Sequence, residues 1–163
     1  MPGNKRNHRK PHRPMNPHAA KLRTQPWRVA AVFGPLEAVI AQIEQSGTVT
    51  ANIHGMPIFK DGNDGGWYAT VPAIEGIIDA YQTHELRCGR PMPLDRLRRF
   101  ARKLEYASPL TLADCATVKE DIAVLRRETM SMTIDYASSL VTTTQIRIEL
   151  QEQERSAACR PQC

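Results

Sequence analysis

The chain has 163 residues, 41% of them hydrophobic and 24% charged, which is ordinary for a soluble globular protein. This length holds one domain with tails, or at most two small domains. No stretch approaches the roughly 18 consecutive apolar residues of a membrane span, no apolar signal region follows the basic N-terminus, and four scattered cysteines do not form a disulfide scaffold. We therefore expect a protein of the reducing cytoplasm that does not enter the membrane.

The net charge of +5 is unevenly distributed along the chain. Residues 1–34 contain eight Lys and Arg and no acid, so the remainder has fourteen basic against seventeen acidic residues. Residues 1–26 are rich in Pro, Asn and Gly and cannot bury enough apolar surface to fold alone. We predict a disordered basic arm that makes non-specific phosphate contacts, and the alternative is a terminus that serves only solubility. The basic residues assigned to nucleic-acid binding here are Lys5, Arg6, Arg9, Lys10 and Arg13.

Residues 27–156 are expected to form a single α+β domain that is mainly α. Residues 27–33 are apolar enough for a strand. Pro35, an apolar row from Leu36 to Ile43 and a terminating Gly47 predict a short amphipathic helix after it.

A small antiparallel meander is predicted next, from three short β-rich runs at 48–53, 58–60 and 67–71. Residues 61–66 resemble a calcium-binding loop only in part, because Gly65 and Pro72 occupy positions where such a loop needs ligands. We interpret these residues as a hairpin turn, and we predict no metal and no other cofactor.

Two amphipathic helices are predicted within residues 72–107. Pro72 opens the first, which runs to about Arg87. The second runs from Leu94 to about Tyr106, with leucines and an alanine at 94, 97, 101 and 104 facing inward. Its other face is predicted to contact nucleic acid, through Arg96, Arg98, Arg99, Arg102 and Lys103. The alternative is a solvated face that is partly neutralised by Asp114, Glu120 and Asp121.

The longest pattern predicts one helix over 111–156, with Thr111 and Asp114 as a capping box. Apolar residues repeat every seven positions over about five heptads. At 1.5 Å per residue the helix would be about 65 Å long. If there are two helices instead, the run Ser138 to Thr144 is where we expect the break.

The heptad pattern has two interpretations, which stay open at this point. One is the seam of a parallel homodimer, with Lys119, Arg126 and Arg147 opposing acidic residues of the partner. The other is a long core helix within one chain. The interface residues of the first interpretation are Val118, Ile122, Leu125, Met132, Tyr136, Ile146 and Leu150.

No catalytic motif is present in the sequence: G-x-S-x-G, H-E-x-x-H and C-x-x-C are all absent. Cys159 and Cys163 fall in residues 157–163, which we expect to be a flexible tail, and His54 and His84 have no catalytic partner at a readable spacing. The sequence therefore favours a small non-enzymatic protein that binds nucleic acid through its arm and basic helix. The alternative is a helical protein–protein interaction or assembly factor that self-associates through residues 115–150.

Overall fold

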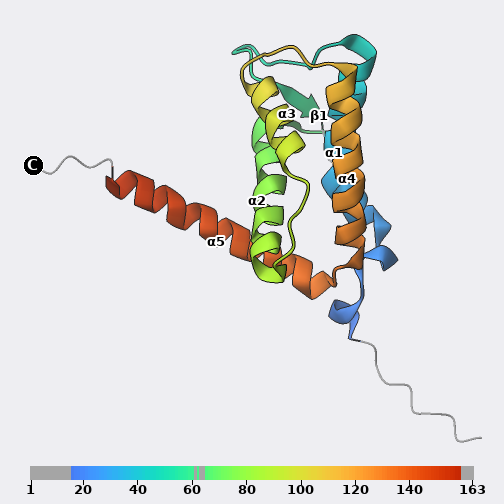
Figure 1. Cartoon of the computed structure of the whole chain (residues 1–163), viewed down its shortest axis with the longest axis vertical. Coiled ribbons are helices and arrows are strands. Elements are labelled where there is room, and N and C mark those ends of the chain that lie inside the picture. Colours follow the sequence, from blue (N-terminus) through green and yellow to red (C-terminus); the bar gives the residue numbers. More distant parts are fainter. Residues whose placement is uncertain (1–15, 61, 63–64, 159–163) are drawn as a thin grey trace, which may run out of the picture.

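The computed structural model describes residues 16–60, 62 and 65–158, and this part of the chain is mainly helical with one small antiparallel sheet. The predicted α+β, mainly α class is confirmed. Helices α1 and α4 lie together on one side, α2 and α3 pack on the other, and α5 passes the base and projects beyond α2 (Figure 1). The elements in chain order are η1 (Pro17–Ala19), η2 (Leu22–Thr24), α1 (Pro26–Ser46), β1 (Ile58–Lys60), β2 (Trp67–Ala69), α2 (Thr70–Cys88), α3 (Asp95–Glu105), α4 (Leu112–Ser131) and α5 (Ile134–Ala158).

The predicted strand at 27–33 is wrong, because α1 is one helix that begins at Pro26 and contains Pro35 in its interior. A proline there removes one main-chain hydrogen bond. The apolar stripe nevertheless continues across it, with Phe33 and Leu36 both buried, so packing on both sides of Pro35 holds the helix together. The helix ends where predicted, at Gly47, whose φ of 74° is in the left-handed region.

The predicted meander is reduced to a hairpin. β1 and β2 pair antiparallel with Lys60 opposite Trp67, which confirms that residues 61–66 connect a hairpin. The run 48–53 contributes only an isolated bridge between Ala51 and Pro57, so the third strand is wrong.

Residues 16–26, predicted as part of the disordered arm, are ordered, and the rest of that arm lies outside the described residues. Leu22 is buried in the core, and its N–H donates to the Met132 carbonyl at 2.9 Å. The Ala20 carbonyl accepts from the Ile134 N–H at 3.0 Å. The buried Leu22 side chain, the partly buried Ala20 and these main-chain hydrogen bonds hold the segment against the core, which composition alone does not show.

The single helix predicted over 111–156 is also wrong, and so is the break predicted at 138–144. The chain leaves the helix at Met132, whose ψ of 151° is extended, and Thr133 forms an antiparallel bridge with Lys21. Thr133 then caps α5, since its hydroxyl accepts from the Tyr136 N–H at 3.1 Å. The predicted N-terminus of this helix is confirmed, because Thr111 and Asp114 form a complete capping box at the start of α4.

The core lies among α1, α2, α3 and α4. α2 and α3 confirm the two predicted amphipathic helices, and the inward row of α3 is buried as expected, with Leu97 fully so. The ring of Phe33 on α1 lies 6.5 Å from that of Tyr81 on α2. Burial raises the pKa of Tyr81 to about 12, and its neutral hydroxyl donates to the Leu125 carbonyl on α4 at 2.9 Å.

Candidate interaction site

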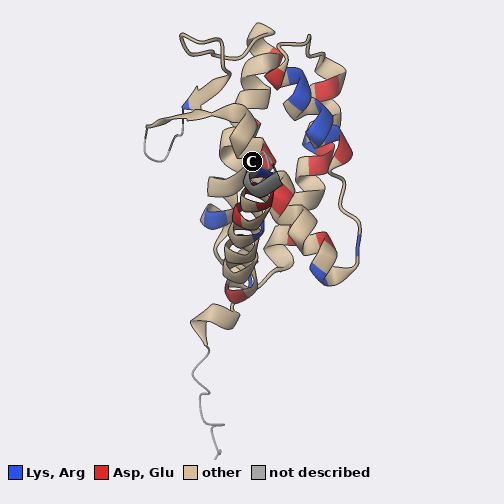
Figure 2. Ribbon diagram, turned by 90° about the vertical axis from the view of Figure 1, so that its left-hand side faces the viewer, with Lys and Arg blue, Asp and Glu red and all other residues tan. Residues whose placement is uncertain are grey.

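The basic face of α3 is largely neutralised by the chain itself. Arg96 lies 2.9 Å from Glu120, and Lys103 lies 2.7 Å from Asp114, both acids being on α4. Arg98 pairs with Asp95 on its own helix at 2.8 Å. Figure 2 shows the basic residues of α3 beside these acidic residues. Three of the five cations therefore form the solvated, partly neutralised face that was the alternative to a nucleic-acid contact.

Two predicted nucleic-acid contacts on α3 remain available. Arg99 and Arg102 are exposed and make no ion pair with any residue that the structure describes. The five cations predicted in the arm, at positions 5, 6, 9, 10 and 13, lie outside the described residues. The structure thus brings two candidate residues together on α3.

The capping box of α4 has a pH-dependent consequence for stability. Hydrogen bonds from Lys103 and Thr111 lower the pKa of Asp114 from 3.8 to about 2. Because the folded pKa lies below the unfolded one, this carboxylate stabilises the fold above about pH 4 and loses that effect as the pH falls towards 2.

Asp114→Asn is expected to lower the free energy of unfolding by about 1 kcal/mol at pH 7, since it weakens the cap and removes the ion pair. The difference from wild type should shrink between pH 4 and pH 2 in urea titrations. Asp95→Asn removes a far more exposed, single-partner carboxylate and is the control. A difference that stays constant over this range contradicts the role given to Asp114.

Four of the seven predicted interface residues are wrong as an interface, because the chain buries them itself. Val118, Ile122, Leu125 and Met132 are each at most 7% exposed. The cations assigned to a dimer seam also pair within the chain: Lys119 with Glu44, Arg126 with Glu37, and Arg147 with Asp79. Along α4 the intramolecular core helix is thus the correct interpretation.

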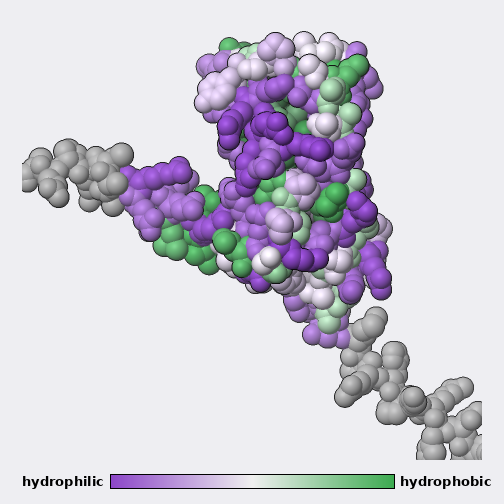
Figure 3. Space-filling view, in the orientation of Figure 1, coloured by the Kyte–Doolittle hydropathy of each residue, from purple (hydrophilic) through white to green (hydrophobic). Residues whose placement is uncertain are grey.

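The part of α5 beyond residue 145, called distal α5 below, differs from α4. Ile146 is 52% exposed and Leu150 is 54% exposed, four residues apart on one side of the helix. Figure 3 shows hydrophobic surface along this projecting part of the molecule. Two of the predicted interface residues are therefore available to a partner.

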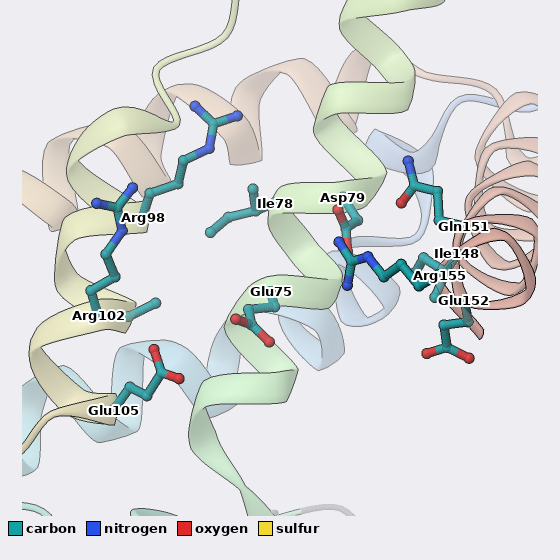
Figure 4. A pocket seen from close by; sticks show the side chains of 11 residues that line it. Glu75, Ile78, Asp79, Arg98, Arg102, Glu105, Ile148, Gln151, Glu152 and Arg155 are labelled. Carbon is teal, nitrogen blue, oxygen red and sulfur yellow. The ribbon is translucent and has the colours of Figure 1, made fainter. Parts of the chain in front are cut away.

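An open, polar cleft separates distal α5 from α3. It has a volume of about 360 Å³, and Figure 4 shows Arg98 and Arg102 of α3 on one side and residues of α5 on the other. Its floor includes Ile78, and its charged residues are of both signs, such as Glu152 and Arg155. Mixed charge gives no preference for an anion or a cation. Distal α5 is joined to α2 at its start by the pair Arg147–Asp79, and the cleft separates its later turns from α3.

A buried polar cluster fastens the first half of α5 to α2 and α4. His84, 4% exposed, lies with Nδ1 2.7 Å from the Tyr136 hydroxyl and Nε2 3.3 Å from Glu128 Oε1. Glu128 also accepts from Arg90 at 2.7 Å, and Arg87 hydrogen-bonds Ser139 at 3.2 Å. Tyr136, predicted at an interface between chains, instead contacts its own chain.

This cluster does not have the geometry of a catalytic triad. Cys88 Sγ, 3.7 Å away, and Glu128 approach the same nitrogen of His84, whereas a triad places nucleophile and acid on opposite nitrogens. Among the described residues no group of three His, Cys, Asp or Glu is arranged to hold a metal ion. The arrangement is suited to joining three helices.

An apolar groove runs between α1 and α2, and the sequence did not predict it. It consists of two pockets of about 120 and 240 Å³ that share Val32, which is 50% exposed. The smaller pocket is lined by Phe59 and Ile77 among others, and the larger by Met132 and Val141. In the sequence, the groove was indicated only by apolar residues outside the rows that were predicted to face the core.

Comparison with protein-family models, curated proteins and solved structures yields no match for this chain. None of the described helices is both long enough and apolar enough to cross a membrane. Functional conclusions accordingly rest on the geometry of the surfaces described above.

Proposed function

We propose that the protein is a non-enzymatic helical assembly protein that self-associates through distal α5. The observation that carries this is the pair Ile146 and Leu150, half-exposed on a helix that extends beyond the body. A helical segment this short gains little stability in water on its own. Packing of its apolar side against another molecule supplies that stability.

The spacing of the pair also suits recognition. Helices that dock into grooves present anchors at positions i and i+4. Burying the exposed halves of Ile146 and Leu150 contributes roughly 2–3 kcal/mol, or about two orders of magnitude in association constant. Loss of these two side chains should therefore be visible in the size of the complexes.

Changing Ile146 and Leu150 to Asp is expected to convert a self-associating chain to a monomer while leaving its thermal unfolding nearly unchanged. Light scattering and sedimentation over a range of protein concentrations measure this. Changing Gln145 and Gln151 to Asp adds the same charges on other sides of α5 and should leave association intact. Wild-type protein that stays monomeric at high concentration contradicts the proposal.

A second candidate function is non-specific nucleic-acid binding, which the unpaired Arg99 and Arg102 favour. Residues 16–158 contain sixteen basic and seventeen acidic residues, so the excess of positive over negative charge lies outside this range, mainly in the arm. Phosphate contacts of this kind weaken steeply with salt.

Changing Arg99 and Arg102 to Glu is expected to weaken binding to generic duplex DNA or RNA about tenfold or more. It should also reduce the magnitude of the slope of log K against log salt by about 2. The same change at Arg23 and Arg127, away from α3, is the matched control. Absence of binding at low salt, or an equal loss in the control, contradicts this function.

A further inference from the structure

We infer that the groove between α1 and α2 is the docking site for distal α5 of a second copy, so that the helix of one chain packs into the groove of another. The inference rests on the proposed self-association and names its receptor. Both halves of a helix-in-groove contact are present on one chain: a projecting helix with two apolar anchors, and an apolar groove with two adjoining pockets.

The groove is shaped for two neighbouring apolar side chains. Its pockets adjoin at Val32, and the smaller, about 120 Å³, holds little more than one large side chain. Small residues on α2 let a helix approach closely: Ala73 lines one pocket, Ala80 lines the other, and a Cβ added at Gly76 between them would meet open space. Anchors four residues apart, as in distal α5, match two adjoining pockets.

Charge also favours distal α5 as the occupant. Of the residues lining the two pockets, Arg28 is the only charged one, and it stacks over Trp27 at 5.0 Å. Distal α5 carries Glu149, Glu152 and Glu154 against Arg147 and Arg155, and Arg147 is already paired with Asp79. A helix with a small excess of acids therefore meets a groove with a basic edge and no acid among its described lining residues.

Thr70 gives an independent sign that the groove receives a ligand. Its side chain lines the smaller pocket and is 1% exposed, yet within the described residues its hydroxyl has no hydrogen-bond partner. An unpaired buried hydroxyl is unfavourable. A polar side chain next to Leu150, such as Glu149 or Gln153, can supply the missing partner when the helix docks.

Docking of distal α5 into the groove must occur between two chains, and it joins two different surfaces. The first half of α5 forms one wall of the larger pocket through Ala137 and Val141, and the helix then runs away from the groove past α2. Distal α5 thus cannot reach its own groove. Because helix and groove are different surfaces, each contact is heterologous: two chains can exchange helices reciprocally in a two-fold dimer, or the contacts can continue into rings or open chains.

Complementation of two variants tests the inference. Val32→Glu disables the groove, and changing Ile146 and Leu150 to Asp disables the helix. Each variant alone should be monomeric. An equimolar mixture should form a 1:1 heterodimer in sedimentation and no larger complex, because one variant supplies the intact helix and the other supplies the intact groove. Ala30→Glu, on another side of α1, should associate like wild type.

Thr70→Val supplies a variant that keeps the shape of the pocket, and it should weaken association about tenfold. If wild type associates but Val32→Glu associates equally well, or the mixture stays monomeric, the groove is not the receptor and the proposed self-association alone survives. If wild type itself is monomeric, the proposed self-association fails and this inference with it.

Discussion

Leu125→Ala is expected to lower the free energy of unfolding by about 2–5 kcal/mol. Leu125 is fully buried on α4, and removal of a core leucine side chain costs both its transfer free energy and that of the cavity left behind. A domain of this size has a total stability of about 5–15 kcal/mol. Urea titrations followed by circular dichroism at low protein concentration measure the effect.

The matched control is Leu150→Ala, the same substitution on the same predicted seam. Leu150 is 54% exposed, so its truncation should change monomer stability by less than about 1 kcal/mol. Equal losses at the two positions would show that α4 and distal α5 do not differ in burial, contrary to the fold described here.

Tyr136→Phe is expected to destabilise the fold by about 1–3 kcal/mol. The substitution removes only the hydroxyl that lies 2.7 Å from His84 Nδ1 and leaves that buried nitrogen without a partner. The edge-on ring contact with His84 and the stacking of Arg87 over the ring are both retained. The change therefore isolates one of the hydrogen bonds that join α5 to α2, the one between Tyr136 and His84.

Tyr106→Phe makes the same change at a site that is 72% exposed, and its effect should be within about 0.5 kcal/mol. Thermal unfolding of both variants gives the comparison. A negligible effect of Tyr136→Phe would contradict the role of the His84 cluster in fixing the first half of α5.

Local patterns in the sequence predicted the elements that local physics determines. Helices α2 and α3, the Gly47 terminus and the Thr111 cap follow from apolar spacing and end signals that act within a few residues. The break at Met132 was not predicted because it depends on the main chain of Lys21, far away in sequence. The Thr133 cap was a readable signal that the continuous heptad pattern obscured.

The candidate site could be predicted only in part for the same reason. The heptad repeat identified Ile146 and Leu150 correctly as apolar positions of one helix, but it did not separate them from Ile122, which the body buries. Burial depends on which helices lie alongside. The groove arises from the spacing between α1 and α2, a property of the packed structure.

Hydrogen exchange in distal α5 at two protein concentrations tests the central claim most directly. When the chain is dilute, amides of residues 146–155 should exchange rapidly, while those of α2 and α4 stay protected. At high concentration residues 146–155 should become protected, and they should lose this protection in the Ile146→Asp, Leu150→Asp double variant. Exchange rates that do not depend on concentration in this segment would contradict the account.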